Sequence, residues 1–137
     1  MYELIIRTQF AAAHNLRRYR GQCERLHGHN WQVEIYLQSV GKKELTRSGM
    51  VIDFKEAKKN INEVLNKFDH RYLNELKEFS PKGRNFNPTT ENLARLLYEQ
   101  VEGRLKSKKI KVSRVCVWES ASCGACYYKN KEIKNTN

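Results

Sequence analysis

The sequence has no long apolar run and few of the residues that interrupt regular structure. Its 137 residues contain no stretch near the roughly 20 consecutive apolar residues that a membrane-spanning helix needs. Two prolines and seven glycines form no linker-like segment that would divide the chain. We therefore expect a single domain over residues 1–130, a flexible tail at 131–137 and no association with membranes.

The N-terminal segment bears on the expected state of the four cysteines. The N-terminus begins as a strand and lacks the basic and apolar segments of a signal peptide, which predicts a cytoplasmic protein. The four cysteines are then expected to be reduced thiols. Cys123 and Cys126 form a Cys-x-x-Cys pair, but no second pair completes a zinc ribbon, and we interpret this pair as structural or incidental.

Acidic residues are few relative to basic ones. Fifteen Asp and Glu stand against 26 Lys and Arg, which gives a net charge of +11. Such a charge suits nucleic acid, a membrane surface or a polyphosphate substrate. The basic residues are scattered, with local concentrations at 17–20 and 106–111, so a solvated basic surface is the simplest interpretation.

Four segments are typical of β-strands. Alternating apolar and polar residues predict strands over 1–14 and 26–39, with a polar, Arg-rich loop between them. Residues 109–119 have the composition of a strand that ends at Trp118-Glu119. Residues 126–129 form a short last strand in this interpretation.

Two segments are typical of amphipathic helices. Asp53 is a good N-cap, Glu56 completes a capping box, and apolar residues then recur at helical spacing as far as Phe68. A second helix begins within Pro88-Thr89-Thr90-Glu91, with a threonine as its cap and the glutamate in its first turn. The order ββααββ predicts an α+β fold, with one antiparallel sheet and both helices on one face.

Three of the four histidines lie within the first thirty residues. His27 and His29 share the apolar face of their strand, and His14 has the same phase at the end of the first strand. If the two strands pair, three imidazoles converge at one end of an apolar face. A single histidine there is usually only a packed side chain. Three neutral imidazoles with an open fourth position, however, form the ligand set of a catalytic zinc ion.

Cys23 precedes the histidine pair as Cys-x-x-x-His-x-His, and two roles stay open for it. As a fourth ligand it would close the metal site and make it structural. As a thiol beside a metal ion and arginines, it would ionise more readily and could act in catalysis. The spacing alone does not decide between these roles.

Two other positions carry ionisable side chains in informative contexts. Asp69-His70 follows the end of the first helix, where a histidine complements the helix dipole. The same pair suits proton transfer, but spacing alone favours the dipole interpretation. Glu119 ends an apolar strand, where a carboxylate is costly unless paired, and it would make a good anchor for a ligand with adjacent N–H donors.

Taken together, these residues resemble the 6-pyruvoyl-tetrahydropterin synthase superfamily, and within it the 6-carboxy-5,6,7,8-tetrahydropterin synthase branch of the queuosine pathway. The resemblance extends from the first strand to about Tyr128. The short Cys-x-x-x-His gap is typical of the carboxy-forming branch, because the pyruvoyl-forming enzymes generally have a longer insertion there. The matching motifs are Phe10-Ala11-Ala12-Ala13-His14, Cys23-Glu24-Arg25-Leu26-His27-Gly28-His29, Gly49-Met50-Val51-Ile52-Asp53-Phe54, Phe68-Asp69-His70-Arg71-Tyr72-Leu73-Asn74, Asn87-Pro88-Thr89-Thr90-Glu91-Asn92-Leu93-Ala94 and Val117-Trp118-Glu119.

The resemblance implies the tunnelling fold, in which subunits pair their sheets into a β-barrel. Trimers then stack into a homohexamer, a dimer of trimers, with active sites at subunit interfaces and no nucleic acid partner. The implied residue roles are zinc binding by His14, His27 and His29, proton abstraction by a Cys23 thiolate with Asp69 and His70 as its acid/base partners, and pterin binding by Glu119 beside Thr89 and Thr90.

The expected substrate is 7,8-dihydroneopterin triphosphate, and the expected products are 6-carboxy-5,6,7,8-tetrahydropterin, acetaldehyde and triphosphate. Zinc suits this chemistry because it stabilises developing alkoxide charge. The basic loop 17–25, which includes Arg25, forms a candidate triphosphate clamp with Arg71, since arginine forks match phosphate oxygens.

Two alternatives stay open. The pyruvoyl-forming reaction uses the same substrate but retains all of its side-chain carbons. A basic nucleic-acid-binding module stabilised by zinc would use Cys23 as a fourth ligand, but it leaves Asp69-His70 and Glu119 unexplained.

Overall fold

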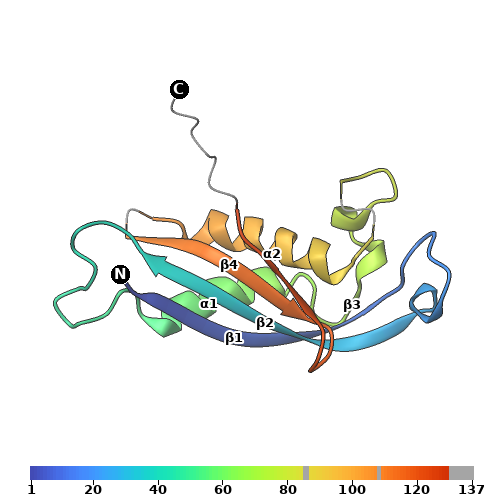
Figure 1. Ribbon diagram of the computed structural model, residues 1–137, viewed down its shortest axis with the longest axis horizontal. Coiled ribbons are helices and arrows are strands. Elements are labelled where there is room, and N and C mark those ends of the chain that lie inside the picture. The colour runs from blue at the N-terminus through green and yellow to red at the C-terminus, as the bar shows by residue number, and fades with distance from the viewer. Residues whose placement is uncertain (85–86, 108, 130–137) are drawn as a thin grey trace.

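Five strands form one sheet, in the order β3-β1-β2-β4-β5, within the residues that the computed structural model describes (Figure 1). These residues are 1–84, 87–107 and 109–129, so the tail expected at 131–137 lies outside them. The strand bounds are β1 (Glu3–His14), β2 (His27–Ser39), β3 (Arg71–Tyr72), β4 (Ile110–Trp118) and β5 (Gly124–Tyr127).

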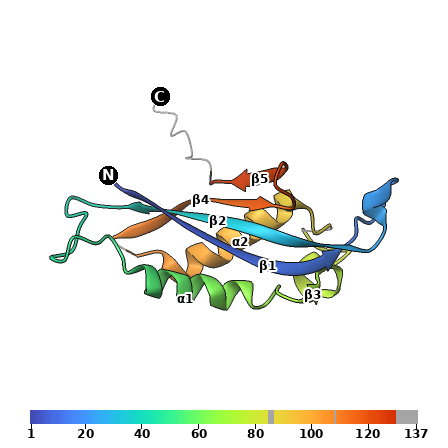
Figure 2. The ribbon, with the colours of Figure 1, turned by 90° about the horizontal axis from the view of Figure 1, so that it is seen from below.

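Both α-helices lie on the same face of the sheet, which confirms the predicted layering (Figure 2). Asp53 caps α1 (Phe54–Leu65) by accepting a hydrogen bond from the Lys55 N–H, and Thr89 caps α2 (Thr90–Leu105). Helix α1 ends three residues before Phe68, the last apolar position of its predicted stripe. No helix in the described ranges is long and apolar enough to cross a membrane.

The core lies between the helices and the face of the sheet that they cover. Residues Trp31, Val33, Ile35 and Leu37 are buried at alternate positions of β2. His27 and His29 continue this phase at the start of the strand and are half-buried, whereas their neighbours on the other face are exposed. The helices contribute Ile61, Val64, Leu93, Leu97 and Val101 to the same cluster.

The sheet is mixed, so the prediction of a wholly antiparallel sheet was wrong in one respect. The pairs β1–β2, β2–β4 and β4–β5 are antiparallel, but the two-residue strand β3 pairs with β1 in parallel. Asp69 and His70, which directly precede β3, form hydrogen bonds with Ala11 of β1 and so hold β3 at this edge of the sheet. A strand of two residues is too short to show the period-2 pattern from which strands are predicted.

The cysteines also differ from expectation. Cys116 and Cys126 form a disulfide, whereas Cys23 and Cys123 are free and exposed. The expectation of four reduced thiols was therefore wrong for one pair. The reason is register, because Cys116 on β4 lies directly opposite Cys126 on β5, with Cα atoms 4.0 Å apart. Cys123 and Cys126, the two cysteines of the Cys-x-x-Cys pair, are therefore not bonded to each other.

Candidate metal centre and substrate site

The three histidines predicted to converge do so at the end of the β1–β2 hairpin. His14 lies directly opposite His27, and His29 lies opposite Ala12. The Nε2 atoms of His14 and His27 are 3.0 Å apart, and one ligand atom from each of the three imidazoles lies within 4.8 Å of the others. Tetrahedral zinc with Zn–N bonds of about 2.0–2.1 Å holds its nitrogens about 3.3 Å apart. The cluster is therefore close to the size that one ion spans.

Backbone carbonyls fix the orientation of two of these imidazoles. The Nδ1 of His14 lies 2.8 Å from the Pro88 carbonyl oxygen, and the Nδ1 of His27 lies 2.6 Å from that of Arg25. A carbonyl only accepts hydrogen bonds, so each Nδ1 carries the proton and each Nε2 keeps its lone pair for the cluster. Metal-binding histidines are commonly held in this way.

The third imidazole has a buried nitrogen without a partner. Among the described residues, no hydrogen-bonding group meets Nε2 of His29, although this atom is shielded from solvent. A buried polar atom of this kind calls for an explanation, and a metal ion held by the three imidazoles supplies one. The donor set therefore fits zinc.

Burial favours the neutral form of two of the three imidazoles. Burial lowers the pKa of His14 and of His29, while the carboxylate of Glu119 partly opposes the shift at His29. Neutral imidazole is the form that binds a metal. Fully buried Trp31 forms the apolar floor, with its ring centroid 4.9 Å from that of His14 and 5.0 Å from that of His29.

Glu119 and Thr90 lie beside the histidine cluster. Glu119 follows β4, and its Oε2 is 4.0 Å from Nε2 of His29 and accepts a hydrogen bond of 3.3 Å from the Thr90 hydroxyl. The Glu119 side chain is 37% exposed, so it can still accept hydrogen bonds from a ligand. Thr89 instead uses its hydroxyl to cap α2, where it accepts from the Asn92 N–H.

Asp69 and His70 form a second ionisable pair at the opposite edge of β1. Oδ2 of Asp69 lies 3.0 Å from Nδ1 of His70, and its Oδ1 accepts from the Ala11 N–H. The Ala11 N–H and the His70 imidazole lower the pKa of Asp69. His70 has a left-handed backbone, with φ 57°, a conformation that costs about 1–3 kcal/mol for a non-glycine residue and is frequent at functional sites.

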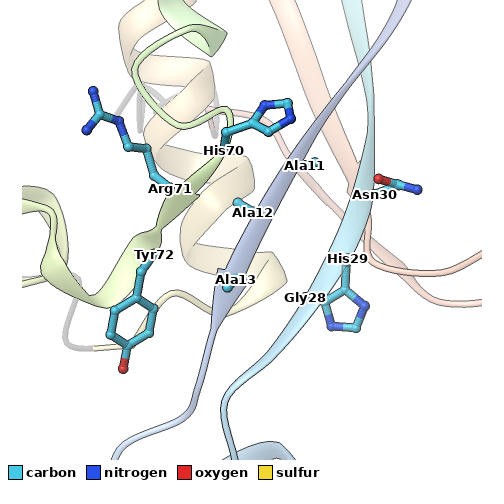
Figure 3. Close-up of a pocket in the computed structure, with 9 residues that line it drawn as sticks. All are labelled: Ala11, Ala12, Ala13, Gly28, His29, Asn30, His70, Arg71 and Tyr72. Atoms are coloured by element: carbon cyan, nitrogen blue, oxygen red, sulfur yellow. The ribbon is translucent and has the colours of Figure 1, made fainter.

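The Asp69-His70 pair lies across β1 from the histidine cluster. His70 and His29 line the same depression of about 570 Å³, together with Ala11, Ala12 and Ala13, and Figure 3 shows β1 passing between the two histidines. The imidazole of His70 is 82% exposed. Its position at the surface leaves it open to a second molecule.

Cys23 also stands apart from the metal ligands. It lies in the single turn η1 (Gln22–Glu24) of the loop between β1 and β2, and its thiol is exposed. Within the described ranges, the group of closely spaced ligand atoms consists of the three imidazoles without Cys23. This arrangement favours the site with an open position over the closed one.

Arg17, in the same loop, is held by backbone carbonyls. Arg17 donates from its guanidinium to the carbonyl oxygens of Phe79 and Asn74, both at 2.7 Å. It therefore holds two loops together rather than facing solvent as a phosphate ligand. Arg25 and Arg71 remain exposed.

The chain was compared with known proteins. The family model of 6-pyruvoyl tetrahydropterin synthase matches residues 3–130. The chain belongs to this family. It is 32% identical over 133 residues to the 6-carboxy-5,6,7,8-tetrahydropterin synthase of Bacillus subtilis, covering 96% of this chain and 87% of that protein. It is 33% identical over 121 residues to the dihydroneopterin monophosphate aldolase of Pyrococcus furiosus, covering 88% and 92%.

The fold of this chain is also similar to that of a solved structure. The 6-pyruvoyl tetrahydropterin synthase of Caenorhabditis elegans superposes with a TM-score of 0.80 at 25% identity, covering 94% of this chain and 96% of that one. Family membership and the named relatives support a pterin-converting enzyme.

Sequence reasoning missed the groups that orient the ligands. The carbonyl that holds His14 belongs to Pro88, 74 residues away in the sequence, and the side chain that secures that segment belongs to Asn87. Both residues lie in one of the motifs that carry the resemblance to the family. Such a motif singles these residues out, but it does not show which atoms they contact.

Proposed function

We propose that this enzyme converts 7,8-dihydroneopterin triphosphate to 6-carboxy-5,6,7,8-tetrahydropterin, acetaldehyde and triphosphate, as a zinc-dependent cytoplasmic enzyme of queuosine biosynthesis. One observation carries the proposal. One ring nitrogen from each of His14, His27 and His29 converges on a common point, the Nδ1 protons of His14 and His27 are fixed by carbonyls, and the Nε2 of His29 has no hydrogen-bond partner and lies next to the Glu119 carboxylate. Bound zinc would supply Lewis acidity toward the side-chain oxygens of the substrate.

Glu119 is proposed to hold the pterin ring. Its carboxylate offers two acceptor oxygens, and the 2-amino group and N3 of a pterin offer two adjacent N–H donors. Thr90 steadies one oxygen by donating to it. The ring would then extend from Glu119 toward His29, and the carbon side chain that reacts would lie over the three histidines.

Cys23 is proposed as the base that removes protons from the substrate side chain, with Asp69 and His70 as the acid/base pair. Because β1 separates this pair from the histidine cluster, we propose that a homohexamer, a dimer of trimers, brings them together at subunit interfaces. The open edges at β3 and β5 suit such pairing of sheets into a barrel. Exposed Arg25 and Arg71 are the proposed contacts of the phosphates.

A second candidate follows from the Pyrococcus furiosus relative, whose name describes an aldolase acting on dihydroneopterin monophosphate. An aldolase breaks a carbon–carbon bond, which requires a base and a group that stabilises developing negative charge. The proposed synthase requires the same groups. The short Cys-x-x-x-His gap and the Bacillus subtilis relative favour the synthase.

The test is incubation of the protein with each substrate and identification of the products by mass. The synthase proposal expects 6-carboxytetrahydropterin and acetaldehyde from the triphosphate, and loss of both after the metal is stripped with a chelator. A product that retains all side-chain carbons would assign the pyruvoyl-forming reaction instead. Cleavage of the monophosphate alone would assign the aldolase. Salt-dependent RNA binding without turnover of either substrate would favour the nucleic-acid-binding module.

A further inference from the structure

Pro88 is buried, and its carbonyl orients a metal ligand. Proline lacks a backbone N–H, so this carbonyl is its one backbone hydrogen-bonding group. It accepts the hydrogen bond from Nδ1 of His14, at 2.8 Å. The orientation of the His14 imidazole therefore depends on where this carbonyl lies, and that depends on the residues on either side of Pro88.

On the C-terminal side, the first turn of α2 fixes the chain. The Thr89 hydroxyl accepts from the Asn92 N–H at 3.1 Å, and the Thr89 carbonyl accepts from the Leu93 N–H at 2.9 Å. One end of Pro88 is thus anchored to a helix.

On the N-terminal side, the anchor is the side-chain amide of Asn87. Its Oδ1 accepts from the Arg17 N–H at 2.7 Å, and its Nδ2 donates to the Arg17 carbonyl at 3.0 Å. Arg17 lies three residues after His14, on the chain that leaves β1. The Asn87 carbonyl in turn accepts from Nδ2 of Asn92, at 2.8 Å.

Together, these contacts form a closed loop of chain segments and hydrogen bonds that begins and ends at His14. The chain leaves His14, reaches Arg17, is tied by two hydrogen bonds to Asn87, and returns through the Pro88 carbonyl to the His14 imidazole. A two-bond amide pair fixes both separation and orientation, which a single bond does not. Among the described residues, removing it would leave the contacts with α2 to anchor the Pro88 segment.

We propose that Asn87 is a positioning residue of the metal centre, which holds the Pro88 carbonyl where it sets the tautomer and the ring orientation of His14. The inference rests on the proposed three-histidine site. Outer partners of metal-bound histidines are typically worth about 10–100-fold in metal affinity. Asn87 acts one step further out, through the Pro88 carbonyl. Because the expected effect is on zinc affinity, it can be measured on the protein without substrate.

The experiment strips the full chain of metal and measures zinc affinity by competition with a chromophoric chelator. Asn87→Ala should bind zinc about 10–100-fold more weakly than the unchanged protein. Asn87→Asp keeps the acceptor for the Arg17 N–H but loses the donor, so its loss should be smaller. Nitrogen-15 spectra of the imidazoles should show that His14 loses its fixed Nδ1–H form in Asn87→Ala.

Tyr98→Phe is the matched control, since it removes a hydroxyl that donates to the Val112 carbonyl, at 3.2 Å, and lies 3.4 Å from Oε1 of Glu102. Val112 pairs with Leu37, ten residues beyond His27 on β2, and thus about 33 Å away along the strand. This variant should bind zinc as the unchanged protein does. An equal loss in Tyr98→Phe would show that affinity follows general stability, and the proposal would fall.

The remaining outcomes are equally decisive. If Asn87→Ala binds zinc within twofold of the unchanged protein, the positioning role is overturned. If the alanine variant does not fold, the zinc affinity of Asn87→Asp is compared with that of the unchanged protein in its place. If the unchanged protein binds no zinc, both the metal site and this inference fail. If it binds zinc but releases no acetaldehyde, the proposed function fails while the role of Asn87 stands or falls on the affinities alone.

Discussion

Replacement of Glu119 by glutamine changes the proposed pterin anchor while leaving its shape almost intact. The new side-chain amide still offers one oxygen to the Thr90 hydroxyl, which contacts the Glu119 carboxylate at 3.3 Å. The other position becomes an NH₂ group that faces the N–H donors of the ring. A hydrogen bond to a charged group contributes about 1.5–3 kcal/mol, and tenfold in binding corresponds to about 1.4 kcal/mol. We expect KM to rise about 10- to 150-fold.

Zinc content should not change in this variant. The group of closely spaced ligand atoms among the described residues consists of the three imidazoles without Glu119, and all three remain in this variant. The assay pairs steady-state kinetics on 7,8-dihydroneopterin triphosphate with metal analysis of the same sample. A normal KM with normal zinc would refute the anchor role, whereas loss of zinc would make Glu119 part of the metal site.

Three other predictions concern catalysis and stability. Cys23→Ala should retain zinc but lose about 10²–10⁴-fold in rate, the usual contribution of a general base, and a loss below tenfold in a kinetic assay would argue against that role. Gly124→Ala places a Cβ 2.5 Å from Cδ2 of Trp118, so urea denaturation should show a loss of about 1–3 kcal/mol. Thiol titration of the unfolded, unreduced protein should find two free thiols per chain, and reduction of the Cys116–Cys126 disulfide, with a sequence separation of 10, should lower the free energy of unfolding by roughly 3 kcal/mol.

The convergence of the three histidines could be predicted from the sequence because it depends on local rules. Alternation along each strand places the imidazoles on one face, and pairing of the two strands brings their ends together across the loop of residues 15–26. The structure confirms the pairing, with His14 directly opposite His27. The same rules predicted both helices and the face of the sheet that they cover.

Features that depend on long-range register could not be predicted in this way. The disulfide of Cys116 required knowing that β5 begins at Gly124 and places Cys126 opposite it. The parallel strand β3 is held by contacts with Ala11 rather than by a pattern of its own. Likewise, the carbonyl that orients His14 comes from a residue 74 positions away.

The separation of Cys23 and Asp69-His70 from the histidine cluster is informative for the same reason. A linear motif places these residues in one site without saying whether one chain can assemble it. In the structure the exposed His70 and the exposed Cys23 thiol lie outside the group of three imidazoles, which is why the proposed catalytic set includes residues from more than one copy of the chain.

X-ray absorption at the zinc edge tests the central claim most directly, because it reports the atoms bound to the metal in solution. The three-histidine site predicts three imidazole nitrogens at about 2.0–2.1 Å, one further light atom, and no sulfur. A sulfur shell at about 2.3 Å would make Cys23 a ligand, close the site and contradict the catalytic role proposed for both the metal and the thiol.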